Sequence, residues 1–352
     1  METKLYRIVE GEKGWEDRFI EGIDEAALII KSGGLVAFPT ETVYGLGANA
    51  LDSQGVEAIF DAKGRPSDNP LIIHIACLGD MERLCEDIPE KALLLAGAFW
   101  PGPLTMVLWK SRGVPYITTG GLSTVAIRMP RHQVALELIR RSGFPIAAPS
   151  ANISGRPSPT KATHVLEDLR GKIPIVLDGG DCDVGIESTV IDLTQERPVI
   201  LRPGFVTAEE IQQVLGCDID MEKGSRCDGI PKSPGIKYKH YSPKAEMVIF
   251  DGDRKNIETE IAKRKSEEEA SGRKVGVILF GETEFEKAAH DFFAKLREMD
   301  EAGVDIILAG ALSYNHGKGL AVMDRMLKSA GLKDDSGTGT ASHALKKVEN
   351  RL

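Results

Sequence analysis

One short segment of the chain places two cations where they could hold a phosphate chain. The segment Lys63-Gly64-Arg65-Pro66-Ser67-Asp68-Asn69-Pro70 carries Lys63 and Arg65 two residues apart, among one glycine and two prolines. A helix cannot continue through these prolines, so we expect a shaped loop. Lys supplies a point charge, and Arg a planar fork that grips two oxygens at once. Taken alone, however, the segment is better explained as a solvated turn between a helix and a strand.

Polar and cationic residues also follow several other predicted strands, where ligands bind in open α/β sheets. Each has an alternative structural explanation. Thr40 and Thr42 could cap a helix, and His74, between two isoleucines, could be a buried structural histidine. The candidates are Thr40 and Thr42, the loop 63–70, Arg128 with Arg131, Ser150 with Asn152 and Ser154, Glu187-Ser188-Thr189, and Arg202-Pro203-Gly204.

Arg128 is the least expected of these residues, because it interrupts the apolar run 125–129. A buried charge without a partner is too costly, so Arg128 needs an anion, either within the protein or in a bound molecule. Gathered at strand ends, such cations would build a local positive pocket in an acidic protein. They are Lys63, Arg65, Arg128, Arg131, Arg202, Lys237 and Lys239.

Several common motifs are missing from the sequence. There is no Gly-x-x-x-x-Gly-Lys-Ser/Thr loop and no Gly-x-Gly-x-x-Gly fingerprint, so a nucleotide would be bound by another architecture. There is also no Gly-x-Ser-x-Gly elbow, which makes Ser188 a weak candidate for a nucleophile.

The composition is that of a globular protein with more than one core. A chain of 352 residues with 42% hydrophobic and 28% charged residues favours two domains. The net charge of -9 argues against a broad basic face for nucleic acid. Five cysteines, an odd number without a Cys-x-x-Cys pair, argue against a disulfide framework or a structural zinc site.

No apolar run approaches the ~20 residues that a membrane-spanning helix needs. The N-terminal segment 1–19 is charged throughout and lacks the apolar core of a signal peptide. We therefore expect a cytoplasmic protein.

Helices alternate with short apolar strands through the first two hundred residues, which predicts an α/β domain with a large, twisted, open mixed sheet. Helices are expected over 24–32, 53–62, 88–99, 133–142 and 207–215. Strands are expected over 35–38, 71–76, 104–109, 124–129, 145–148, 173–177, 188–193 and 198–201.

The pattern changes after about residue 205. Residues 222–243 are rich in Gly, Pro and Lys and lack periodicity, which is typical of a linker or an ordered flap. We divide the chain into a first domain (15–206), a linker with a flap (207–245) and a smaller, doubly wound α/β domain (246–352). Its strands are expected over 247–250, 275–280 and 305–309, and its helices over 254–270, 284–299 and 319–330.

Eight segments, taken in order, resemble the YrdC-like threonylcarbamoyl-AMP synthases in their longer, two-domain form. The resemblance covers nearly the whole chain, and eight strings in fixed order are far more specific than any one of them. They are PTETVYGLG (39–47), KGRPSDNPL (63–71), WPGPLT (100–105), VAIRMPRH (125–132), APSANISGRPSPT (148–160), ESTV (187–190), LRPG (201–204) and SPGIKYKHYSP (233–243).

The resemblance implies a nucleotidyltransferase that makes L-threonylcarbamoyladenylate and diphosphate from L-threonine, bicarbonate or CO2, and ATP. The N-carboxylate of threonine would attack the α-phosphorus and displace pyrophosphate. Mg²⁺ is the implied cofactor, held by ATP and water without protein ligands. The product would pass to a separate tRNA threonylcarbamoyl transferase for tRNA modification. We identify no general base.

The resemblance also implies roles for individual residues. Lys63 and Arg65 would hold the triphosphate and act in catalysis. Threonine would be bound by Thr42, His74, Arg128 and Ser188, with Arg128 facing its carboxylate. A role in supporting the flap is implied for the C-terminal domain. ATP would be bound by Lys63, Arg65, Asn69, Thr124, the backbone of Ala148, Ser150, Asn152, Ser158, Arg202 and, from the flap, Tyr241.

Two other classes of function stay open on the residues alone. An RNA-binding module would grip a phosphate backbone in its positive cavity, although the acidic total charge weighs against it. A carbamoyl-phosphate-handling protein is the other hypothesis, since related domains occur in carbamoyl transfer. The threonine-pocket residues, and the absence of an attached acylphosphatase or zinc-finger region, argue against that second hypothesis.

Overall fold

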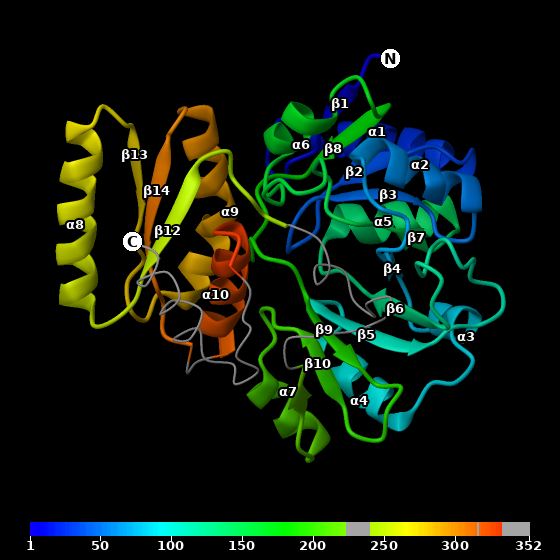
Figure 1. Ribbon diagram of the computed structural model, residues 1–352. Helices are drawn as coiled ribbons and strands as arrows, with labels where there is room; N and C mark the ends of the chain where they lie inside the picture. Colours follow the sequence, from blue (N-terminus) through cyan, green and yellow to red (C-terminus); the bar gives the residue numbers. More distant parts are fainter. Residues whose placement is uncertain (223–239, 315–316, 333–352) are drawn as a thin grey trace.

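The chain folds around two β-sheets, one in each of two domains (Figure 1). The computed structural model describes residues 1–222, 240–314 and 317–332. Most of the predicted flap, including Lys237 and Lys239, therefore lies outside the described residues.

The larger domain contains an eleven-stranded sheet in the order β1-β8-β2-β3-β7-β4-β6-β5-β9-β10-β11. The sheet combines parallel pairs such as β4 with β6 and antiparallel pairs such as β5 with β6, which confirms the predicted mixed sheet. The strands are β1 (Lys4–Arg7), β2 (Val36–Phe38), β3 (Gly45–Asn49), β4 (Ile72–His74), β5 (Leu104–Trp109), β6 (Thr124–Arg128), β7 (Ile146–Ala147), β8 (Ile175–Asp178), β9 (Thr189–Asp192), β10 (Val199–Arg202) and β11 (Asp220–Met221).

Two strands and one helix of this domain extend beyond the range 15–206. β1 pairs with β8, and β11 pairs with β10, so each edge of the sheet gains a short strand. The domain's helices are α1 (Trp15–Lys31), α2 (Ser53–Lys63), α3 (Asp80–Leu84), α4 (Glu90–Phe99), α5 (Gln133–Ser142), α6 (Ala162–Leu169) and α7 (Ala208–Leu215).

The helices cover both faces of the large sheet, because neighbouring side chains of a strand point to opposite faces. In β2, Val36 and Phe38 pack into a core with α1 and α5, whereas Ala37 packs into the core on the other face. The helix α1 begins at Trp15 rather than at residue 24. Its first two turns bury little apart from Gly22 and Ile23 at their end, so they carry a weak periodic signal.

The end of α2 separates the two cations of the segment 63–70. Asp52 caps the start of this helix by accepting a hydrogen bond from the backbone nitrogen of Gln54 at 3.0 Å. The helix ends at Gly64, whose φ of 60° lies in the left-handed region that favours glycine. Lys63 is therefore the last helical residue, and Arg65 is the first residue of the loop proper.

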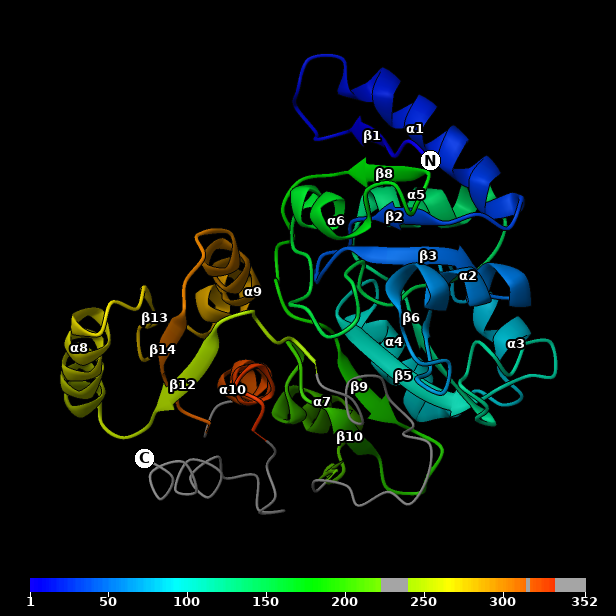
Figure 2. The ribbon, with the colours of Figure 1, turned by 45° about the horizontal axis from the view of Figure 1, so that its top comes forward.

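The smaller domain contains a parallel three-stranded sheet in the order β12-β14-β13. Helix α8 lies on one face, and α9 and α10 lie on the other, toward the larger domain (Figure 2). This arrangement confirms the predicted doubly wound pattern. The elements are β12 (Glu246–Phe250), α8 (Arg254–Ala270), β13 (Val275–Ile278), α9 (Phe285–Glu301), β14 (Ile306–Gly310) and α10 (Gly317–Ser329).

The two domains share a hydrophobic core. Val43 and Ile186 of the larger domain pack into one buried cluster with Phe292 and Phe293 of α9 and with Tyr241. Two domains joined in this way are expected to move little relative to each other. Within the described residues, none of the helices combines the length and the hydrophobicity needed to cross a bilayer.

Candidate functional site

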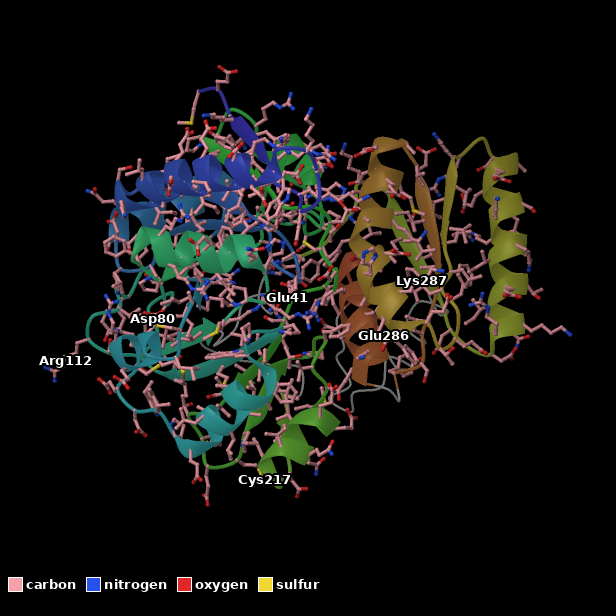
Figure 3. The ribbon with its side chains drawn as sticks, turned by 180° about the vertical axis from the view of Figure 1, so that it is seen from behind. Glu41, Asp80, Arg112, Cys217, Glu286 and Lys287 are labelled. Atoms are coloured by element: carbon pink, nitrogen blue, oxygen red, sulfur yellow. The ribbon has the colours of Figure 1, made fainter. Side chains whose placement is uncertain are left out.

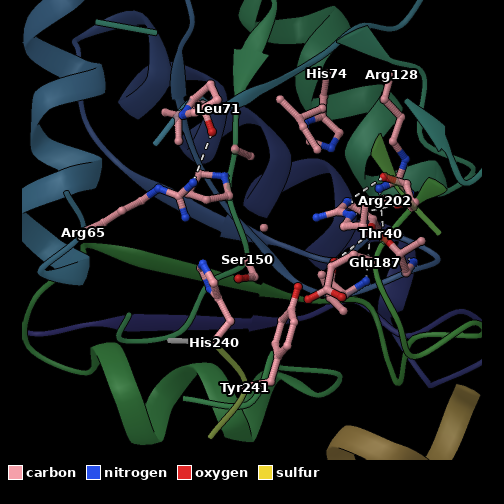
Figure 4. Close-up of a pocket in the computed structure, with 18 residues that line it drawn as sticks. Thr40, Arg65, Leu71, His74, Arg128, Ser150, Glu187, Arg202, His240 and Tyr241 are labelled. Carbon is pink, nitrogen blue, oxygen red and sulfur yellow. Dashed lines mark hydrogen bonds between the residues drawn. The ribbon is translucent and has the colours of Figure 1, made fainter. Parts of the chain in front are cut away.

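A cavity that opens to solvent lies at the ends of the central strands of the larger domain (Figure 4). Small molecules commonly bind in pockets at such strand ends. Several strands meet there because β3 and β7 run antiparallel to their neighbours β2 and β4. The cavity is lined by Thr40, Thr42, Val43, Gly45, Arg65, Pro70, Leu71, Ile72, His74, Arg128, Ala148, Pro149, Ser150, Glu187, Ser188, Arg202, His240 and Tyr241.

Most of the residues predicted for the site are brought together around this cavity. Those that line it are Thr42, Arg65, His74, Arg128, Ala148, Ser150, Ser188, Arg202 and Tyr241. The other predicted residues, all within the described part of the chain, are not among its lining: they are Lys63, Asn69, Thr124, Asn152 and Ser158.

Arg128 has an anionic partner inside the protein. Its Nη2 forms an ion pair with Glu41 Oε2 at 2.7 Å, and both side chains are buried. Its Nη1 donates to Thr42 Oγ1 at 2.9 Å, and its Nε donates to the Gly102 carbonyl at 3.2 Å. The charge of Arg128, which interrupts the apolar strand, is therefore paired within the protein and held in place.

Glu41, the ion-pair partner of Arg128, is the buried residue near the site that sequence reasoning missed most clearly. Its side chain is fully buried, near the centre of the view in Figure 3, and neither of its carboxylate oxygens accepts a hydrogen bond from the described residues. The available signal was its position between Thr40 and Thr42, in a run where the other side chains are apolar or small.

Arg202 and Ser188 form a second buried group near Arg128. Arg202 Nη2 donates to the Ser188 carbonyl at 3.0 Å and to Ser188 Oγ at 3.3 Å. The Ser188 hydroxyl is also 2.8 Å from Thr105 Oγ1. Burial lowers the pKa of Arg202. The nearby Arg325 lowers this pKa further, whereas Tyr241 and Glu187 raise it. An anion at this end of the cavity would relieve the cost of burying these charges.

Arg65 occupies the opposite end of the cavity, with His240 and Ser150 nearby (Figure 4). Its Nη2 donates to the Pro70 carbonyl at 3.1 Å and to the Asn69 carbonyl at 3.3 Å, so the side chain folds back over its own loop. The cavity therefore has a cationic group at each end.

Lys63 does not line the cavity, and its predicted contact with a triphosphate stays a prediction. Its side chain is buried, and its Nζ donates to the Ser150 carbonyl at 2.5 Å and to the Asn152 carbonyl. Burial, together with the charge of Arg65, holds the pKa of Lys63 well below its ordinary value. Lys63 thus supports the cavity wall formed by residues 150–152 from behind.

The remaining predicted residues also shape the walls. Ser158 Oγ donates to Glu187 Oε1 at 2.5 Å. The Asn152 amide accepts from Ser150 Oγ at 2.5 Å and donates to backbone carbonyls of its own loop. Thr124 begins β6, at the other end of the strand from Arg128. Ser158 and Asn152 therefore orient the loops of the site.

Two histidines at the cavity are held in the neutral form. Burial, reinforced by the charge of Arg128, lowers the pKa of His74 to about 3. Burial, together with Arg65 and Lys328, lowers the pKa of His240 to about 3. Neutral imidazoles offer hydrogen bonds without adding charge. His240 was not predicted, although it lies beside Tyr241 in the matched string.

Tyr241 forms the part of the cavity wall that separates the cavity from the smaller domain. It is buried, its ring centroid lies 5.1 Å from that of Phe293 of α9, and its φ is 62°. A residue other than glycine in this left-handed conformation is strained, which is a common feature of functional sites.

The fold and the site define a two-domain α/β protein with a cavity that carries Arg65 at one end and Arg128 with Arg202 at the other. Similarity to known proteins narrows this class. The family model described as "Telomere recombination" matches residues 28–204, and the model described as "Threonylcarbamoyl-AMP synthase, C-terminal domain" matches residues 206–331.

A threonylcarbamoyl-AMP synthase of Pyrococcus abyssi is 52% identical over 343 residues, covering 94% of this chain and 98% of the relative. One of Bacillus subtilis is 46% identical over 327 residues, covering 88% and 93%. The crystal structure of P. abyssi Sua5 complexed with L-threonine matches with a TM-score of 0.84 at 51% identity, covering 94% of this chain and 98% of that one. The chain belongs to the two-domain threonylcarbamoyl-AMP synthase family, which confirms the resemblance.

Proposed function

We propose that this protein is a threonylcarbamoyl-AMP synthase, which converts L-threonine, bicarbonate or CO2, and ATP into L-threonylcarbamoyladenylate and diphosphate. The observation that carries the proposal is the single cavity with Arg65 at one end and Arg128 with Arg202 at the other. The names of the relatives and the L-threonine in the P. abyssi structure support it.

Threonine is assigned to the end formed by Thr42, His74, Arg128 and Ser188. Arg128 faces the carboxylate, and its ion pair with Glu41 fixes the guanidinium before the substrate arrives. A cation that is already oriented loses little side-chain entropy on binding. Neutral His74 can donate or accept a hydrogen bond there without repelling the substrate's ammonium group.

ATP is assigned to the other end and to the adjoining wall. Arg65 contacts the triphosphate, Ser150 and the backbone of Ala148 contact the nucleotide, and Arg202 lies where the two substrates meet. Tyr241 covers the nucleotide. Lys63 acts in this arrangement through the loop that it holds, together with Asn152 and Ser158.

The chemistry needs no nucleophilic side chain. The N-carboxylate of threonine forms a bond to the α-phosphorus of ATP, and the bond to the bridging oxygen breaks as pyrophosphate leaves. Arginines at both ends hold the two anions in line and stabilise the charge that develops. Water has to be excluded from the cavity because the adduct hydrolyses readily.

ATP enters as its magnesium complex in this proposal. Among the described lining residues, Glu187 is the one carboxylate, and Ser158 and Arg325 hold its two oxygens. This donor set suits a cation that brings its own phosphate and water ligands. A separate transferase in the cytoplasm, where ATP and tRNA are present, would then use the product for tRNA modification.

The test is pyrophosphate release measured with each substrate left out in turn. Release is expected only with ATP, threonine and bicarbonate together, and radiolabelled bicarbonate should enter the nucleotide product. Release without threonine would contradict the proposal. Competition of carbamoyl phosphate with ATP would favour carbamoyl transfer instead, and steeply salt-dependent RNA binding without turnover would favour an RNA-binding module.

A further inference from the structure

Two fully buried arginines of the smaller domain reach into the larger domain. Arg297 lies on α9 and Arg325 on α10, and the side chains of both are 0% exposed. Arginine is rarely buried unless most of its donors are satisfied. Among the described residues, Nη2 of Arg325 has no hydrogen-bond partner, and its other two nitrogens are bonded. Each arginine therefore marks a place where the smaller domain contacts the larger one through specific, costly hydrogen bonds rather than through apolar surface alone.

Arg325 bonds to one residue that lines the cavity and lies close to two other parts of its wall. Its Nε donates to Glu187 Oε2 at 3.0 Å, and its Nη1 donates to the Pro203 carbonyl at 2.6 Å. Its guanidinium carbon lies 6.0 Å from the centre of the Tyr241 ring. Glu187 and Tyr241 line the cavity, and Pro203 directly follows Arg202, which also lines it.

The bond to Pro203 fixes the position of Ser188. Gly204 packs so closely on the next segment that an added Cβ would lie 2.3 Å from the Thr189 nitrogen. Arg202 reaches back across the same contact to donate to the Ser188 carbonyl at 3.0 Å. A shift of the turn at Pro203 would therefore move Arg202 and Ser188 together.

The bond to Glu187 supports a further lining residue at the same end of the cavity as Arg202. Glu187 accepts from Arg325 through one oxygen and from Ser158 Oγ through the other. Asp324, beside Arg325 on α10, accepts from Arg325 Nη1 at 2.9 Å and so balances the buried cation. Only a planar fork with several donors can serve acceptors that lie in such different directions.

We propose that Arg325 is a positioning residue for the reaction, so that the smaller domain completes the active site by holding Glu187, the turn after Arg202, and Tyr241 in place. This inference rests on the proposed function. It gives the smaller domain a direct part in catalysis, in addition to any support for the flap.

Arg297 is a matched control. Its Nη2 donates to the Pro157 carbonyl at 2.7 Å and pairs with Asp168 at 2.9 Å, and its Nη1 pairs with Glu167 at 3.2 Å. None of these described partners lines the cavity. Pro157 precedes Ser158, and Asp168 also accepts from the Ile153 nitrogen at 3.1 Å, so Arg297 supports the loop 150–158 on the ATP side. Removing Arg297 therefore breaks an equally buried contact between the domains without removing a bond to a residue of the threonine end.

The experiment compares Arg325→Met with Arg297→Met in the full chain, by thermal unfolding and by steady-state pyrophosphate release. Both variants should unfold at lower temperature. Only Arg325→Met is expected to raise the KM for threonine, by about tenfold or more, which corresponds to ~1.4 kcal/mol. Equal changes of KM in both variants, or an unchanged KM in Arg325→Met, would overturn the proposal.

A double-substitution cycle tests the same coupling from the larger domain. If Arg325 acts through Glu187, then Arg325→Lys and Glu187→Gln should each raise the KM for threonine, and the double variant should be little worse than either. Fully additive losses would contradict the coupling. Arg325→Lys also replaces Arg325→Met if the latter does not fold.

The two possible failures are distinct. Absence of threonine-dependent turnover in the unsubstituted protein would refute the proposed function. Normal turnover in that protein, together with an unaltered KM in the Arg325 variants, would refute only the inference about Arg325.

Discussion

The two ends of the cavity are built in different ways. At one end, Arg65 bonds to the carbonyls of Asn69 and Pro70, which are four and five residues away in the sequence. At the other end, Arg128 bonds to Thr42 across 86 residues, and Arg325 holds Glu187 across 138 residues. One end is a local loop, and the other is a buried network that joins several strands and both domains.

The difference predicts where the site is rigid. Buried hydrogen-bond and ion-pair networks hold their groups in one arrangement, whereas loops with few buried contacts open at low cost. A rigid end suits the small, compact threonine, and an adaptable end suits a triphosphate that must enter and leave as pyrophosphate. Substitutions of the buried groups should therefore affect stability, and substitution of Arg65 in the loop should affect turnover alone.

The largest loss of stability is expected for Arg128→Met. The substitution leaves the Glu41 carboxylate buried without its cation, and breaking such a pair costs about 3–5 kcal/mol. The free energy of unfolding, measured by urea denaturation, should fall by this amount, and threonine-dependent turnover should be lost. The double variant Glu41→Gln with Arg128→Met should regain much of the stability but none of the activity. A stable single variant would show that the two ends are not built differently.

Lys63→Met should come next. It removes the donor from the carbonyls of Ser150 and Asn152, and buried acceptors left without a donor cost about 1–3 kcal/mol each. We expect a loss of about 2–3 kcal/mol in the free energy of unfolding, accompanied by weaker ATP binding because the wall at 150–152 shifts. Unchanged stability with lost turnover would place Lys63 among the groups that contact substrate.

His74 should make stability depend on pH. Its pKa is about 3 in the folded protein, while an unfolded histidine titrates near 6.5. Between these values the unfolded chain binds a proton that the folded protein does not, so stability falls as the pH falls. At pH 5 this amounts to about 2 kcal/mol relative to pH 7. His74→Gln should reduce the difference in unfolding free energy between pH 7 and pH 5 by that amount, and identical differences would contradict the assignment.

The smallest change in stability is expected for Arg65→Ala. Arg65 is half-buried in its own loop, so the free energy of unfolding should change by less than about 0.5 kcal/mol. Turnover should nevertheless fall by about a hundredfold or more, as it does when a group that stabilises transition-state charge is removed. A clear loss of stability, or nearly normal turnover, would contradict the proposed difference between the loop around Arg65 and the buried end around Arg128.

Much of the fold could be predicted from patterns in the sequence. The alternation of helices with short apolar strands gave the mixed sheet, and Gly64 and the prolines of 63–70 placed a loop after α2. Helix α6 and the start of α1 could not be found in this way. Their buried residues depend on packing against strands and helices that are distant in the sequence.

The identity of the anion that pairs with Arg128 could not be predicted from the residues alone. The sequence required an anion for a charge within an apolar strand, but it could not distinguish Glu41 from a bound carboxylate. Arg128 and Glu41 lie 87 positions apart in the sequence, and only the pairing of strands around the cavity brings them together.

The sequence by itself determined which residue types the site contains and that they follow strand ends, because local propensity and turn chemistry act over a few residues. The tertiary structure decided which of these groups face the cavity. It turned Lys63 inward and Arg65 toward the cavity, and it brought Arg325 of the second domain to the walls of the first. Those choices depend on burial and on hydrogen-bond partners supplied by distant segments, which no local pattern encodes.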